Sequence, residues 1–154
     1  MCHKWWLVAG LAACLIPAMA LSQEEDPETW RRRLAGLVKE RQADMQQIGR
    51  DAKLIGELMK TGEFGSVAAP AERIRLLAEA MRDKYLFGSD MEPSHSAPVV
   101  FESFPMFRTF VDRFASVAAT TRDAAKGNGD VREAVANLFK ECKSCHDVFV
   151  KPPE

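Results

Sequence analysis

The feature that most constrains this chain is the segment Cys142-Lys143-Ser144-Cys145-His146, which lies close to the C-terminus. The two cysteines are three residues apart and the histidine follows directly, so on a helix all three side chains share one face. Two thiols at this spacing can form thioethers with the vinyl groups of one porphyrin, and the adjacent imidazole can bind its iron. A zinc ribbon would need a second cysteine pair, and a thioredoxin-type site would need a βαβ context; the sequence shows neither. The segment therefore predicts one covalently attached haem c, with Cys142 and Cys145 as anchors and His146 as the proximal iron ligand.

The N-terminal residues have the pattern of an export signal. Lys4 precedes an apolar run that extends to Leu21, and Ala18-Met19-Ala20 is a typical cleavage triplet. We expect residues 1–20 to be a signal peptide removed after Ala20, and residues 21–154 to form one exported domain. Two alternatives remain open, namely retention of the run as a membrane anchor, and lipidation of Cys14 within a lipobox-like segment. Cleavage after Ala20 would leave Cys142 and Cys145 as the only cysteines of the mature chain.

Four stretches of the remaining chain carry apolar residues every three or four positions, as amphipathic helices do. They cover residues 27–62, 70–88, 104–125 and 131–149, with Asp26 and Asp130 as N-caps. Residues 88–98 have turn composition and form the longest break. The sequence contains no sustained two-residue alternation of the kind that marks a strand. These patterns predict an all-α fold, an antiparallel four-helix bundle with covalent haem near the C-terminus.

Charge and motif content exclude several function classes. The chain has 21 Lys and Arg against 22 Asp and Glu, which argues against a nucleic-acid partner because such proteins concentrate basic charge. The sequence shows neither a Ser/His/Asp arrangement, a two-carboxylate hydrolase pattern nor a closed zinc site. We therefore expect a protein that is not an enzyme.

Two residues of the first predicted helix, Arg41 and Met45, suit a haem better than they suit a plain core. Arg41 lies on the apolar stripe, where an unpaired charge is costly to bury, and a haem propionate could pair with it. Met45 lies one turn further along the same face, where its thioether could reach the iron opposite His146. The alternatives are a snorkelling arginine at the bundle edge and a methionine that only fills space. Other candidates for the sixth iron position are Met59, Met81, Met91, Met106 and His95.

With these residues the chain resembles the cytochrome c-prime family, the c-type cytochromes whose haem is attached near the C-terminus. The resemblance rests on segments 41–45, 101–107, 129–130 and 142–149. It implies a periplasmic four-helix bundle with one covalent haem, often a homodimer through its first two helices. Two positions depart from the family pattern: Val150 stands where a basic residue is frequent, and Phe101 stands where tryptophan is common.

The resemblance also implies two functional types. In the cytochrome c-556 type a distal methionine binds the iron and makes a low-spin electron carrier, and Met45 falls on that distal position. We therefore predict a periplasmic electron carrier with His146 and Met45 as axial ligands, which exchanges electrons with redox partner proteins. The alternative is the five-coordinate, high-spin cytochrome c-prime type, which binds nitric oxide or carbon monoxide.

Overall fold

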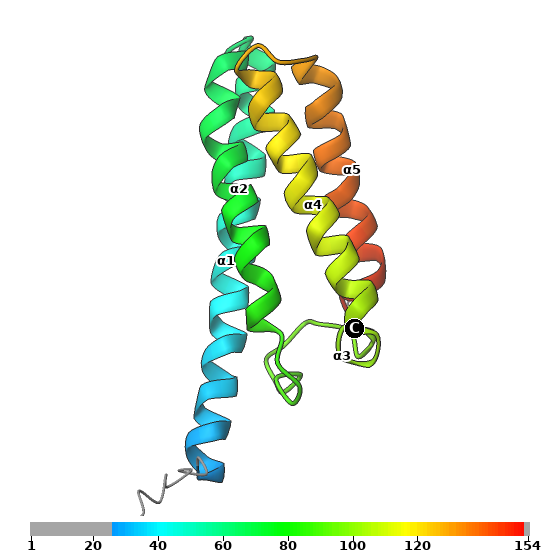
Figure 1. Ribbon diagram of the computed structural model, residues 1–154. Coiled ribbons are helices and arrows are strands. Elements are labelled where there is room, and N and C mark those ends of the chain that lie inside the picture. Colours follow the sequence, from blue (N-terminus) through cyan, green and yellow to red (C-terminus); the bar gives the residue numbers. More distant parts are fainter. Residues whose placement is uncertain (1–25, 153–154) are drawn as a thin grey trace, which may run out of the picture.

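The structure, a computed structural model, describes residues 26–152, and its four long helices form an antiparallel bundle (Figure 1). The elements in chain order are α1 (Pro27–Thr61), η1 (Phe64–Val67), α2 (Ala68–Met81), η2 (Arg82–Lys84), α3 (Val99–Glu102), α4 (Phe104–Ala125) and α5 (Val131–Phe149). Among the described residues no strand forms, and a single isolated bridge joins Ser96 to Val150. The predicted all-α four-helix bundle is confirmed. The expected signal peptide, its cleavage after Ala20 and the lipobox at Cys14 lie outside the described residues.

Short-range signals explain where the long helices begin and end. The Asp26 carboxylate accepts hydrogen bonds from the backbone N–H groups of Glu28 and Thr29, and so caps α1. Gly62 ends α1 with a φ of 81°, a left-handed conformation that glycine adopts without steric cost. Asp130 caps α5 in the same way as Asp26 caps α1. These boundaries agree with those expected from the sequence.

The second helix is shorter than predicted, because α2 ends at Met81 and Tyr85 is not helical. Its expected continuation to Gly88 is wrong. Two carbonyl groups that a further helical turn would use accept hydrogen bonds from side chains instead. Arg41 donates to the Lys84 carbonyl, and Ser89 Oγ donates to the Leu86 carbonyl. The chain therefore leaves the bundle axis and forms an irregular segment before α3.

All four long helices contribute to one core. Ile55, Ile74, Val111 and Leu138 come from α1, α2, α4 and α5 respectively, and each is at most 1% exposed. Burial of apolar side chains from all four helices in this core stabilises the bundle. None of the described helices is long and apolar enough to span a membrane.

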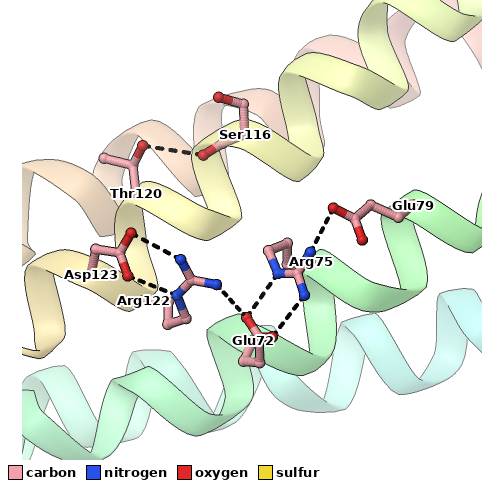
Figure 2. A network of polar contacts seen from close by, with 7 residues as sticks. All are labelled: Glu72, Arg75, Glu79, Ser116, Thr120, Arg122 and Asp123. Atoms are coloured by element: carbon pink, nitrogen blue, oxygen red, sulfur yellow. Dashed lines mark hydrogen bonds and ion pairs between the residues drawn. The ribbon is translucent and has the colours of Figure 1, made fainter.

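An ion-pair network joins the outer faces of α2 and α4 (Figure 2). The Glu72 carboxylate accepts hydrogen bonds from Arg75 on its own helix and from Arg122 on α4. These two guanidinium groups lower the pKa of Glu72 to about 2. The network fixes α2 against α4.

At the other end of the bundle, the α1/α2 pair and the α4/α5 pair diverge toward the segment that links α2 to α3 (Figure 1).

Candidate functional site

The last turns of α5 place the attachment residues at the inner surface of the bundle. Cys142 and Cys145 are partly buried, pack against the hydrophobic core and are not joined in a disulfide. Burial raises the pKa of the Cys142 thiol, and burial together with the charges of Cys142 and Glu141 raises the pKa of Cys145 to about 11. His146 follows on the same helix face. The structure thus brings the three residues of the predicted haem motif together.

Two apolar cavities lie against this face. The first has a volume of about 300 Å³ and the second about 180 Å³. Both are bordered by Cys145 and His146 from α5, by Met45 from α1 and by Met81 from α2. Because the two cavities share these walls, they form adjoining parts of one space between α1, α2 and α5.

Met45 contributes to the walls of both cavities, as its assignment as a distal residue requires. Among the other candidates for the sixth iron position, Met81 borders both cavities and His95 borders the first. The remaining three methionines, Met59, Met91 and Met106, border neither cavity. The cavity walls therefore narrow the candidates for the sixth iron position to Met45, Met81 and His95. They are compatible with a Met45 thioether that binds the iron and with one that does not.

An aromatic cluster forms the wall of the first cavity next to α4. The Tyr85 and Phe107 ring centroids are 4.5 Å apart, and Phe107 contacts Phe149 edge-on at 5.2 Å. Burial raises the pKa of Tyr85, while the nearby charge of Arg41 and a hydrogen bond with Ser96 lower it. Sequence reasoning placed Tyr85 on a helix stripe and missed its role in this wall, because the turn that directs it inward depends on distant contacts.

Arg41 is buried, with 5% of its surface exposed, and also borders the first cavity. Its side chain therefore does not snorkel to solvent. The guanidinium donates hydrogen bonds to the Lys84 carbonyl, to Ser89 Oγ and carbonyl, and to Ser94 Oγ. Sequence reasoning missed both serines, since turn composition was their only signal. Burial lowers the pKa of Arg41 from its ordinary value.

The lining of the cavities fits a large, mostly apolar group with a charged edge. The space is bordered by the two thiols that would form the covalent bonds of this group and by the imidazole that would bind its iron. The remaining walls of the space are mainly apolar. Arg41 and Gln42 border the first cavity at one side. Within the described part of the chain no carboxylate lies within ion-pair distance of Arg41, and the charge of Asp90 offsets only part of the effect of burial on its pKa. A haem with carboxylates at one edge suits these residues.

Comparisons with known proteins agree with this geometry. Residues 36–150 match the family model described as Cytochrome C'. A comparison with curated protein sequences found no match. Among solved structures, the chain is similar to the cytochrome c prime from Shewanella frigidimarina, with 25% identity, a TM-score of 0.70 and coverage of 77% of this chain and 97% of that one.

Two further structures share the fold at lower identity. Cytochrome c' from Rubrivivax gelatinosus is 22% identical with a TM-score of 0.65, and the match covers 75% of this chain and 94% of that one. The nitric oxide complex of a cytochrome c prime variant from Alcaligenes xylosoxidans is 18% identical with a TM-score of 0.68, with coverage of 77% and 97%.

Proposed function

The chain belongs to the cytochrome c′ family, and on that premise we propose that it binds a diatomic gas, nitric oxide or carbon monoxide, in the apolar space beside His146. Haem c is bound covalently in this family, here through Cys142 and Cys145. When bound, it supplies the iron that would hold the gas. We assign His146 as the proximal iron ligand. The nitric oxide complex of the Alcaligenes xylosoxidans relative supports the proposal by likeness.

The observation that carries the proposal is the lining of the second cavity, whose walls would surround the haem and a gas bound to its iron. Apart from His146 and the two cysteines, its walls consist of Gly49 and side chains without a hydrogen-bond donor or a strong acceptor, which are Met45, Ile48, Ala52, Met81, Val111 and Phe114. An anion or a water molecule would lose its hydrogen bonds in such surroundings, at a cost of several kcal/mol. A small neutral molecule would not, so these residues favour a gas over a charged ligand.

A second candidate function rests on the position of Met45. Its side chain borders both cavities together with His146, so its thioether is available as a distal ligand. Ligation by Met45 would occupy the sixth iron position and make the protein a low-spin electron carrier of the cytochrome c-556 type. In that case Met45 and His146 would be the iron ligands in both oxidation states.

Location and partners follow from the same proposal. We place the mature protein in the periplasm, where a redox partner protein would reduce it, and we assign it no catalytic residue. Pairing through the first two helices would make it a homodimer.

The test is the absorption spectrum of the purified holoprotein, oxidised and reduced, with and without carbon monoxide or nitric oxide. We expect a high-spin spectrum in the absence of gas and a large shift when either gas is added to the reduced form. A low-spin spectrum in both oxidation states, with little response to gas, would overturn the gas-binding proposal and favour the electron carrier.

A further inference from the structure

The hydrogen bonds of Arg41 all reach one segment, residues 84–94, which links α2 to α3. Nη1 lies 3.0 Å from the Lys84 carbonyl and 2.6 Å from Ser89 Oγ, and Nη2 lies 2.6 Å from the Ser89 carbonyl and 3.3 Å from Ser94 Oγ. Ser89 is 0% exposed and Ser94 is 3% exposed, so the bonds to these two serines are shielded from water. One side chain on α1 thus joins the beginning, the middle and the end of the segment.

The electrostatics make this segment and Arg41 depend on each other. Neutral oxygens accept the N–H groups of the buried guanidinium, which also lies 4.4 Å from the centre of the Tyr85 ring and 5.9 Å from that of Phe101. Moving the segment away would leave a buried cation without acceptors, which costs far more than the loss of an exposed contact. The neighbouring residues add to the attachment, because Gln42 donates to the Pro93 carbonyl and Asp44 pairs with Lys84 at 2.6 Å.

The segment held in this way leads directly into a wall of the first cavity. Tyr85, Ser94, His95 and Ser96 border that cavity. On its far side the chain is attached to the end of α5, where the Lys151 N–H donates to the His95 carbonyl and the Ala97 N–H donates to the Phe149 carbonyl. Residues 84–97 therefore bridge α1 and the end of the helix that carries His146.

We propose that Arg41 is a positioning residue that fixes segment 84–94 against α1 and thereby keeps the first cavity closed on that side. This role goes beyond the proposed function, since it requires the haem cavity but not a particular gas or an open sixth position. It assigns the guanidinium to the protein's own segment, in addition to any contact with a haem carboxylate. Ser89 and Ser94 are its partners in this role.

The experiment measures amide hydrogen exchange by mass spectrometry on the holoprotein, in peptides that cover residues 85–96 and residues 105–125 of α4. The variants are Arg41→Met, Arg41→Lys and the double variant Ser89→Ala/Ser94→Ala, which leaves Arg41 in place. Arg132→Met is the matched control, because Arg132 also lies over an aromatic ring, that of Phe64 at 4.6 Å, but at the start of α5. Carbon monoxide association with the reduced protein is followed in parallel.

We expect exchange in residues 85–96 to rise by about tenfold or more in Arg41→Met, because several charge-assisted hydrogen bonds are lost together. The serine double variant should show a smaller rise in the same peptide, and Arg41→Lys should restore part of the protection. Exchange in α4 should stay unchanged, which separates local opening from general destabilisation. Carbon monoxide association should become faster in Arg41→Met, and Arg132→Met should behave as wild type throughout.

Unchanged hydrogen exchange in residues 85–96 of Arg41→Met would overturn the proposal. If the reduction potential of that variant shifted at the same time, the two results would indicate that Arg41 interacts with the haem and not with the segment. If Arg41→Met does not fold, the serine double variant decides, and unchanged exchange in its 85–96 peptide would overturn the proposal. A wild-type protein that does not respond to carbon monoxide would refute the proposed function but leave the exchange results valid. The two failures are therefore distinguishable.

Discussion

Replacing Met45 with leucine separates the chemistry of its sulfur from the space that it fills. The exchange nearly conserves volume, and such substitutions in a core cost less than about 1.5 kcal/mol, so the variant should fold. Met81→Leu is the matched control, because Met81 borders the same two cavities but comes from α2. Any effect common to both variants reports on packing, and any effect confined to Met45→Leu reports on its thioether.

The expected size of the effect follows from competition. A thioether bound at the sixth position would have to be displaced by an incoming gas, and each 1.4 kcal/mol of its binding lowers the apparent gas affinity about tenfold. The proposed gas binding requires an open sixth iron position, so we expect an unbound Met45. Carbon monoxide affinity should then differ by less than about threefold between wild type, Met45→Leu and Met81→Leu, a difference of about 0.7 kcal/mol.

The assay is a carbon monoxide titration of the three reduced proteins, with oxidised spectra recorded through the far red, where a sulfur-to-iron band would lie. A low-spin wild type that becomes high-spin only in Met45→Leu, with at least about a tenfold gain in carbon monoxide affinity, would refute the reasoning. The thioether would then be a ligand, and the electron-carrier function would replace gas binding.

Three further predictions concern the rest of the described chain. Arg75 and Arg122 hold the pKa of Glu72 at about 2, below its ordinary 4.5, so the stability that this carboxylate contributes is present above pH 4.5 and is lost as the pH falls toward 2. Urea unfolding of Glu72→Gln should show a smaller loss of stability over that range than wild type, and equal losses would contradict the assignment. Asp51 is buried and accepts hydrogen bonds from Arg73 and Gln47. Asp51→Asn should therefore lower the free energy of unfolding by about 2 kcal/mol. This loss is smaller than that for a fully buried ion pair, because the Arg73 side chain is 47% exposed. Glu57→Gln, which breaks an exposed pair with Lys60, should change it by less than about 0.5 kcal/mol, and a similar loss in both variants would contradict the role given to burial. In the apoprotein the Cys145 pKa of about 11 should slow alkylation at pH 8 by on the order of a hundredfold relative to an exposed cysteine, and equal rates would show that the thiol is not desolvated.

The parts of the fold that were predictable from sequence are those determined by neighbouring residues. Asp26, Gly62 and Asp130 mark helix ends because a side-chain oxygen or a missing Cβ acts on the backbone within three residues. The apolar periods of the third and fourth predicted helices placed Val111 and Leu138 in the core correctly, since burial on a helix follows its repeat.

Long-range polar contacts explain the failures. Asp51 lies on the first helix among charged and polar residues, yet it is buried because Arg73, 22 residues later, pairs with it. The second predicted helix extended too far because its stop depends on Arg41, 43 residues earlier in the chain, which takes the Lys84 carbonyl. Local patterns contain no information on either partner.

The same division explains why haem attachment could be predicted from the sequence, whereas the state of the sixth iron position could not. Attachment needs Cys142, Cys145 and His146 on one helix face, and their spacing alone provides this. The sixth position depends on whether α1 lies close enough for Met45 to reach the iron. Contacts of Arg41 and Asp44 with residues 40 to 53 positions later in the chain hold α1 at this end of the bundle. Without these contacts α1 and Met45 could move relative to α5, so we expect substitutions in residues 84–94 to alter gas binding.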